Sequence, residues 1–481
     1  MIIIGGGIGG LASALRLLHK GYEVEVFEKE NTLGGRVNQI ISNLGYRFDL
    51  SASILLLPQT FYELFSDLGL NLQDYLEMNL LHPTYRVFYK NQEIIDFSTE
   101  LAELVPQLES FSSEDAAGYL AWLTDIYNKY RVIDESFLRK SFESLGEFLN
   151  PKTMANLLKS KPFNSTTDYL KSFIKDERVL NYLSFQAMFI GMNPYESSNL
   201  YTLLPAVSQL YGLYYIKGGM YELIKVLEKL ILEKGGRIHL NSEVQKIVTS
   251  NHRAIGVSVG GDFIKGDIIL ANADVLYVNE CLLGESPQKY KMSCSTYILY
   301  LGVKQKLPKF SVHNLYIGPE FEKNITAPFI GAVPEKPSLY VYMPTSIDEN
   351  LAPKGCECLN IMVRVPNLLK ANVWNTEAKE GLKTYIYDVL EQLTEIAEFE
   401  KVVEFESDFT PVDMLNKFNA SLGSAFGVSP DLNQTNYFRP HHKSKTYEGL
   451  YYVGASTHPG TGISLVLHSA KLVSDIICHN K

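Results

Sequence analysis

Three glycines near the start of the chain have the spacing of a phosphate-binding turn. Gly5, Gly7 and Gly10 follow the apolar run Ile2–Ile4. In such a turn the first glycine allows a sharp bend, the second lets a pyrophosphate approach the backbone, and the third lets the next helix pack on the strand. Backbone N–H groups at the positive end of that helix would hold the phosphates. The residues of this turn predicted to form the dinucleotide site are Gly5, Gly7, Ile8, Gly9 and Gly10.

The segments around this turn are those that such a site requires. The pattern of residues 11–20 predicts an amphipathic helix, which Gly21 ends. Residues 23–28 alternate as in a strand, and Glu28 closes it with a carboxylate that can accept hydrogen bonds from ribose hydroxyls. Strand, glycines, helix, strand and acid occur in the order of a dinucleotide-binding unit. The acid disfavours NADP, whose extra phosphate would lie beside it.

The next motif distinguishes FAD from NAD. Gly34, Gly35 and Arg36 follow Glu28 closely, and this element resembles the E-x-x-x-x-x-G-G-R sequence of FAD enzymes in the amine oxidase and phytoene desaturase superfamily. The glycines allow a second close approach of the backbone to the cofactor, and the arginine can neutralise pyrophosphate as a bidentate donor. We therefore predict FAD as the cofactor, with Gly35 and Arg36 among the residues that bind it.

A middle segment is predicted to complete the sheet around this site. Residues 216–220 precede a helical pattern that ends at two glycines. Strands are predicted after it, at residues 237–240, 244–248, 254–259 and 267–273. In the superfamily that the chain resembles, the strand holding Val244 passes the adenine, so the resemblance implies that Val244 binds the base.

A glycine-rich segment near the end of the chain, residues 450–463, predicts a strand, a turn and the start of a helix over residues 464–478. It resembles the C-terminal flavin loop of bacterial carotenoid desaturases. The N–H groups at the start of the helix could stabilise negative charge on the reduced flavin. His458 either faces the flavin or is a loop histidine beside a rigid proline, and the sequence leaves both open. The flavin-binding residues predicted here are Gly454, Ala455, Gly462 and Ile463.

The resemblance extends over essentially the whole chain, which is similar to the bacterial carotenoid (phytoene) desaturase family and above all to its C30 members. It implies an α/β protein with a discontinuous Rossmann-like FAD-binding domain and an inserted mixed α+β substrate domain. It also implies successive dehydrogenation of 4,4′-diapophytoene to 4,4′-diaponeurosporene, with oxygen or a quinone as electron acceptor. Further similar segments are residues 173–178, 189–194, 201–205, 423–427 and 436–440.

One segment departs from the family pattern. Phe48-Asp49-Leu50 is followed by Ser51-Ala52-Ser53, where the family has Gly-Pro. This leaves the backbone of the loop, and any flavin contact there, open.

The predicted organisation divides the chain into three parts. The FAD-binding domain comprises residues 1–75, 206–289 and 411–481. Residues 76–205 form a mostly helical region facing substrate or membrane, and residues 290–410 form a mixed sheet-helix substrate domain. In this last part we expect strands at residues 295–303, 339–343 and 358–363 and a helix near 376–395.

The expected chemistry requires few polar groups. A flavin accepts one hydrogen as hydride, and the other leaves as an acidic proton from an allylic cation-like centre. The protein would then mainly orient the substrate and exclude water, which predicts a long apolar tunnel. We name no catalytic acid or base and no metal site. A C30 carotenoid oxygenase of the same fold, a flavin amine oxidase and a lipid-binding flavoprotein remain alternatives.

Composition sets limits on partners and location. The net charge of −10 argues against nucleic acid as a partner, because phosphate neutralisation needs a basic face. Five cysteines without disulfide or zinc spacing favour a reducing cytosol. No segment reads as a membrane span. Residues 153–161 combine apolar side chains with lysines, and either rest on a bilayer or form a solvated helix. The family resemblance implies an enzyme bound to one membrane leaflet. We therefore expect a cytoplasmic enzyme associated peripherally with a membrane surface, whose oligomeric state the sequence does not indicate.

Overall fold

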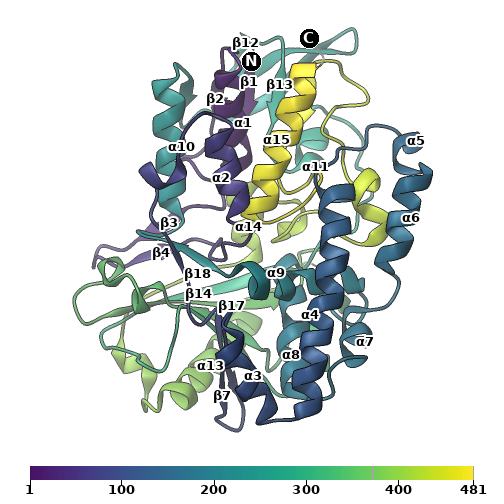
Figure 1. Ribbon diagram of the computed structural model, residues 1–481. Helices are drawn as coiled ribbons and strands as arrows, with labels where there is room; N and C mark the ends of the chain where they lie inside the picture. The colour runs from purple at the N-terminus through teal and green to yellow at the C-terminus, as the bar shows by residue number, and fades with distance from the viewer. Residues whose placement is uncertain (371–372, 480–481) are drawn as a thin grey trace.

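A parallel sheet of five strands forms one end of the molecule, which we describe from a computed structural model covering residues 1–370 and 373–479 (Figure 1). Its strands come from distant parts of the chain. Residues 269–271 pair with residues 2–4 on one side and with residues 450–452 on the other. Their order is β19 (Leu450–Tyr452), β13 (Ile269–Ala271), β1 (Ile2–Ile4), β2 (Glu25–Phe27) and β9 (Arg237–His239). Each is short and mostly buried, as expected for parallel strands covered on both faces.

Three helices cover one face of this sheet and a small antiparallel sheet covers the other. The helices are α1 (Ile8–His19), α10 (Tyr221–Glu233) and α15 (Ile463–His479), whose apolar faces meet in one core with the underside of β1. The opposite face packs on β10 (Val244–Ser250), β11 (Arg253–Val259) and β12 (Asp262–Lys265). This arrangement brings the carboxyl ends of the parallel strands to one edge, where ligands bind in such sheets.

A seven-stranded mixed sheet forms the other end of the molecule. Helix α13 (Thr376–Thr394) covers one of its faces, and the opposite face carries tyrosines that pack toward the helical region. The strand order is β18 (Val403–Phe409), β14 (Ser295–Val303), β17 (Glu357–Val365), β16 (Leu339–Tyr342), β15 (His313–Ile317), β6 (Tyr85–Tyr89) and β7 (Ile94–Phe97).

Helices from residues 101–211 form a layer along one side of the molecule (Figure 1). They are α3 (Leu101–Glu109), α4 (Ser113–Ile133), α5 (Leu145–Phe148), α6 (Pro151–Ser160), α7 (Thr166–Lys171), α8 (Glu177–Phe185) and α9 (Leu203–Tyr211). The remaining elements are β3 (Gln39–Ile41), β4 (Arg47–Asp49), α2 (Gln59–Ser66), β5 (Met78–Leu80), β8 (Tyr214–Ile216), α11 (Val275–Tyr277), α12 (Phe321–Thr326) and α14 (Pro411–Phe418).

The expected fold class is confirmed, and the strands and helix predicted within residues 290–410 are found within two residues of their bounds. The region 76–205 is less uniform than its pattern suggested, because β6 and β7 join the seven-stranded sheet. The division into three parts stays a prediction. Among the described residues no helix has the length and apolarity needed to cross a membrane, and no cluster of side chains is arranged to hold a metal ion.

Candidate active site

One large cavity, of about 560 Å³, lies between the two sheets. At one end it is lined by glycine-rich turns at the carboxyl edge of the parallel sheet, and at the other by apolar side chains of the seven-stranded sheet and the helical layer. Of the predicted cofactor-binding residues all but Gly10 line it, and His458 lines it too. Gly10 instead lies where α1 crosses β1, since a Cβ there would come 2.4 Å from the carbonyl oxygen of Gly5.

Glu28 is already engaged by the first glycine turn. Its two carboxylate oxygens accept backbone N–H bonds from Gly6, at 2.7 Å, and from Glu30, at 2.9 Å. Each oxygen keeps a second lone pair, so the group can still accept ribose hydroxyls. Burial is the largest influence on the pKa of Glu28 and raises it, while these backbone bonds oppose the rise.

The Gly-Gly-Arg turn lies directly against the first turn. The N–H of Gly34 donates to the carbonyl oxygen of Gly6 at 2.8 Å, and a Cβ at Gly35 would come 3.4 Å from Cα of Gly7. Arg36 reaches across to the last third of the chain, where it donates to the carbonyl oxygen of Ala425 at 2.6 Å. No carboxylate of residues 1–370 or 373–479 lies within 4 Å of its guanidinium. Burial lowers its pKa, so a phosphate anion would relieve an uncompensated charge.

Asn272 joins the first turn to the C-terminal loop, and the sequence reasoning did not single it out. Its side-chain amide donates to the carbonyl oxygen of Gly5 at 3.1 Å. A Cβ at Gly9 would come 2.7 Å from the Asn272 side-chain oxygen, and one at Gly454 would come 3.0 Å from the same atom. Its position directly after the buried strand β13 is the signal that could have found it, because ligands bind at the carboxyl ends of such strands.

The C-terminal loop carries His458 and leads into the positive end of α15. Gly462, Ile463 and Ser464 line the cavity where α15 begins. The imidazole of His458 is buried, its Nε2 bonds to the carbonyl oxygen of Phe137 at 2.9 Å, and its Nδ1 has no protein partner. Burial lowers the pKa of His458 to about 3, so the ring is neutral. It ties the loop to the end of the helical layer.

Arg439 holds the same loop in place. In the sequence it is noted only as part of residues 436–440, one of the segments that resemble the family. Its guanidinium is 2% exposed and donates to the carbonyl oxygens of Ala455, Thr457 and Val428.

The loop that departs from the family pattern is accommodated without glycine. Neither Ser51 nor Ala52 has a positive φ. The Ser51 hydroxyl donates to the carbonyl oxygen of Arg36 at 2.9 Å, which binds this loop to the Gly-Gly-Arg turn. Both residues line the cavity.

The far end of the cavity is an apolar chamber. Its lining includes Phe189, Ile298, Met362, Leu203 and Val207. Arg364 is the one charged side chain that the described residues of this chamber contribute. It donates to the carbonyl oxygen of Met188 and to the hydroxyl of Thr296, and it lies over the ring of Phe426 at 5.0 Å.

These residues fit a flavin dinucleotide. Two turns expose their backbone to the cavity, and an arginine without a carboxylate within 4 Å among the described residues lies beside them. A buried carboxylate with free lone pairs and a helix N-terminus border the same space. The apolar chamber beyond them suits a hydrocarbon. Fold and site thus define a flavin-dependent oxidoreductase.

Comparison with known proteins agrees with this class. The sequence model described as flavin containing amine oxidoreductase matches residues 8–276. A 4,4′-diapophytoene desaturase (4,4′-diaponeurosporene-forming) of Staphylococcus haemolyticus is 36% identical, over 98% of this chain and 97% of that protein. The protein of the same description from Staphylococcus aureus strain MRSA252 is 34% identical, with the same coverage. Wild-type putrescine oxidase bound to putrescine has a TM-score of 0.65 at 13% identity, covering 99% of this chain and 98% of that one.

The chain therefore belongs to the flavin-containing amine oxidoreductase family, in the group of the 4,4′-diapophytoene desaturases. Its cofactor is FAD.

Proposed function

We propose that this protein converts 4,4′-diapophytoene to 4,4′-diaponeurosporene by successive dehydrogenations. The observation that carries the proposal is the continuity of the cavity, which joins a dinucleotide cradle to an apolar chamber without a wall between them. Two relatives that align with 98% of the chain, at 36% and 34% identity, are named for this reaction.

In this reaction FAD, when bound, accepts hydride from the substrate. The chain's own residues bind and orient. The turns at Gly7 and Gly35 and the charge of Arg36 would hold the pyrophosphate, and Glu28 and Val244 would hold ribose and adenine. The apolar chamber would align the substrate and exclude water, which protects a cationic centre from hydration.

The chamber argues against amine oxidation. An amine substrate enters as an ammonium ion, with which a carboxylate would pair. The described residues of the chamber contribute no carboxylate. The C30 oxygenase reaction remains the alternative that the experiment below has to separate.

Coexpression with a diapophytoene synthase tests the function. Extracted pigments should show the absorption of a conjugated polyene and masses that fall by two hydrogens per step. Products that gain oxygen at terminal methyl groups would indicate the oxygenase. Colourless cells containing unchanged diapophytoene, with FAD-loaded protein present, would contradict the proposal. Assays with oxygen or a quinone as sole oxidant identify the electron acceptor, which we propose to be one of these two.

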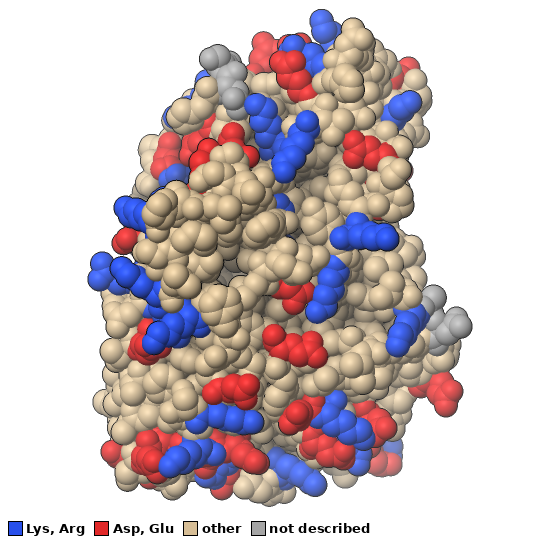
Figure 2. Space-filling model, turned by 90° about the vertical axis from the view of Figure 1, so that its right-hand side faces the viewer, with Lys and Arg blue, Asp and Glu red and all other residues tan. Residues whose placement is uncertain are grey.

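We also propose that the enzyme rests on a membrane by an apolar patch, which we define as Leu145, Leu149, Leu158, Phe163 and Phe438. Leu158 and Phe163 are 63% and 74% exposed, and the ring of Phe438 contacts that of Phe148 in α5. Leu157 and Ser160 of α6, the helix that carries Leu158, line the cavity, so this helix borders both the cavity and the patch. Figure 2 shows this side of the molecule, where uncharged residues surround a hollow.

Lysines beside the patch suit an anionic bilayer. Lys152, Lys159 and Lys161 are exposed, and no carboxylate among the described residues lies within 4 Å of their ammonium groups. A juxtamembrane cation contributes about 1 kcal/mol near an anionic surface. Five unpaired cysteines favour the cytoplasmic face.

Liposome sedimentation tests the membrane proposal. Leu158→Glu with Phe163→Glu should abolish cosedimentation with vesicles of phosphatidylglycerol and phosphatidylcholine. Phe263→Glu is the control, because it places a carboxylate at an apolar side chain that is 54% exposed on β12, outside the helical layer. Unchanged sedimentation of the double variant would contradict the proposed docking surface.

A further inference from the structure

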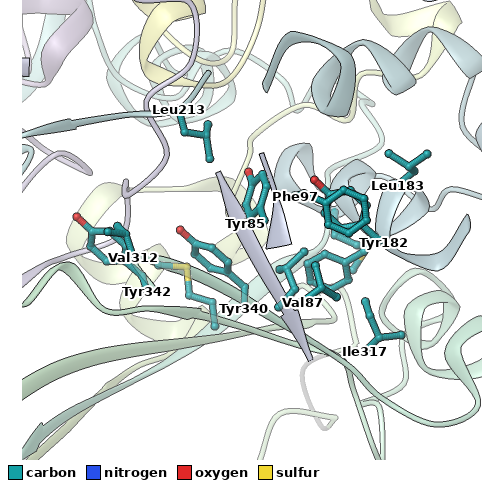
Figure 3. Close-up of a cluster of buried hydrophobic side chains, with 14 of the residues drawn as sticks. Tyr85, Val87, Phe97, Tyr182, Leu183, Leu213, Val312, Ile317, Tyr340 and Tyr342 are labelled. Carbon is teal, nitrogen blue, oxygen red and sulfur yellow. The ribbon is translucent and has the colours of Figure 1, made fainter. Parts of the chain in front are cut away.

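A chain of three polar groups runs from the cavity into the seven-stranded sheet. The Tyr340 hydroxyl lies 3.0 Å from the Ser53 hydroxyl and 2.7 Å from Nδ1 of His313. Tyr340 and Ser53 line the cavity, whereas His313 lies behind them with 1% of its surface exposed. Figure 3 shows Tyr340 on the same face of the sheet as Tyr85 and Tyr342, with their hydroxyls directed away from the strands.

The chain ends where cofactor and substrate must meet. Ser53 belongs to the loop whose Ser51 binds the carbonyl oxygen of Arg36, so it comes from the cofactor end of the cavity. Tyr340 comes from β16 of the opposite sheet, and its ring contacts Phe189 of the apolar chamber. The Tyr340 hydroxyl therefore lies on the boundary between cradle and chamber.

His313 is built to be an uncharged acceptor. Its Nε2 is buried and has no partner among the residues that the structure describes, so none of them stabilises a second ring proton. Burial lowers the pKa of His313 to about 3, which keeps the ring neutral at physiological pH. When Nε2 carries the single ring proton, Nδ1 offers a lone pair to the Tyr340 hydroxyl, and a lone pair of Tyr340 Oη is left toward the cavity.

We propose that Tyr340 is a catalytic residue that takes the substrate proton, with His313 as the positioning residue that receives the tyrosine's own proton. This rests on the proposed function. Hydride loss to oxidised FAD leaves an allylic cation. The C–H bond on the neighbouring carbon breaks, and its electron pair forms the new double bond. That proton binds Tyr340 Oη while the tyrosine O–H proton moves to Nδ1 of His313.

A weak base suffices for this step, because a C–H bond next to a carbocation is strongly acidic. The same weakness makes the relay reversible. The buried imidazolium returns its proton to Tyr340 Oη, and the other proton on that oxygen passes by way of the Ser53 hydroxyl to bulk water once the product has left. The relay is neutral between turnovers, so it adds no further charge to the apolar chamber beside Arg364.

The test uses Tyr340→Phe and His313→Gln in the FAD-loaded enzyme, with Tyr85→Phe as the matched control. Tyr85 is a buried tyrosine of β6, which pairs with the His313 strand β15, and it is absent from the cavity lining formed by the described residues. We expect Tyr340→Phe to slow anaerobic single-turnover product formation by about 10²-fold, the lower end for general acid–base help, with FAD content unchanged. Tyr85→Phe should remain within threefold of wild type.

Two further readouts separate chemistry from structure. Wild type should show a solvent deuterium isotope effect on the single turnover, because the tyrosine O–H proton moves, and His313→Gln should lose it. The ¹⁵N resonance of His313 Nδ1 should be that of an unprotonated ring nitrogen at pH 7. A protonated Nδ1 would overturn the proposal whether or not the substrate is correct, and so would near-normal rates in both variants. Absence of any desaturation by wild type would instead refute the proposed function.

The pH profile gives a third check. The titratable groups around the His313 ring are Tyr85 of β6 and Tyr340 and Tyr342 of β16, with Asp49 bonded to Tyr342 and Arg364 near Tyr340. None of the tyrosines ionises near neutrality, because burial raises the pKa of each. Asp49, whose pKa burial raises to about 7, titrates near this range, so we expect no limb at the ordinary histidine pKa of about 6.5 that depends on His313. A limb near pH 6.5 that His313→Gln abolishes would contradict a neutral acceptor.

Discussion

Replacing Glu28 by glutamine should weaken FAD binding and also loosen the turn that binds it. In the structure both carboxylate oxygens already accept backbone N–H groups, from Gly6 and Glu30. A glutamine side chain keeps one oxygen and turns an NH₂ group toward the other N–H, so one buried donor loses its acceptor. An unsatisfied buried donor costs about 1–3 kcal/mol, which corresponds to a roughly 5- to 150-fold increase in the FAD dissociation constant if the cost falls on binding.

Flavin titration of the apoprotein, followed by fluorescence quenching, measures that constant, and thermal unfolding of the apoprotein measures the share of the cost that falls on the fold. Glu23→Gln is the control, because it removes the same charge from an exposed position just before β2. An FAD affinity within twofold of wild type, together with an unchanged apoprotein melting temperature, would refute this reasoning and show that Glu28 is dispensable in both roles.

Three other predictions concern packing and acid. Gly381→Ala should stabilise the protein by about 0.5–1 kcal/mol in chemical denaturation, because the site lies within α13 and a Cβ there meets nothing within 4 Å. Gly10→Ala should prevent FAD binding and lower the melting temperature, since its methyl group would press on the carbonyl oxygen of Gly5. Lowering the pH from 7 to 5 should destabilise the protein by about 2 kcal/mol for each buried neutral histidine, because the histidine binds a proton in the unfolded chain but not in the folded protein. Asp49, whose pKa burial raises to about 7, should stabilise the folded protein by about 2 kcal/mol over the same range, because it binds a proton at a higher pH in the folded protein than in the unfolded chain. Denaturant titrations at the two pH values measure the net effect, and equal stabilities would contradict it. The histidines, with pKa values of about 3 to 4, are His313, His442 and His458.

The sequence was most informative where a site depends on neighbours along the chain. The first turn, Glu28 and the Gly-Gly-Arg element are recognisable because their spacing is local, and the long strands β14 and β17 are apolar enough to stand out. Contacts between distant residues left no such pattern. The bond between Tyr340 and Ser53 joins positions 287 residues apart, and that between Arg36 and Ala425 joins positions 389 apart.

The same limit explains why parts of the substrate end were missed. Strands β6 and β7 lie within a region whose remaining pattern is helical, and the pairing of β6 with β15 depends on residues more than 200 positions later. Asn272 and Arg439 donate hydrogen bonds to backbone carbonyl oxygens. In a sequence, an asparagine or arginine with this role looks the same as one on the surface. Only the assembled fold shows what they hold.

The strand order of the parallel sheet has a consequence for how the protein is made. Strand β1 leaves the ribosome some 270 residues before its neighbour β13, and β19, beside β13, follows about 180 residues after that. The seven-stranded sheet is complete once residue 409 has emerged. The nascent chain thus has this sheet in place while the cradle is still open, and capture of FAD must follow the synthesis of β19 and α15 rather than guide it. Chains that stop short of β19 and α15 should accumulate as flavin-free protein and be degraded.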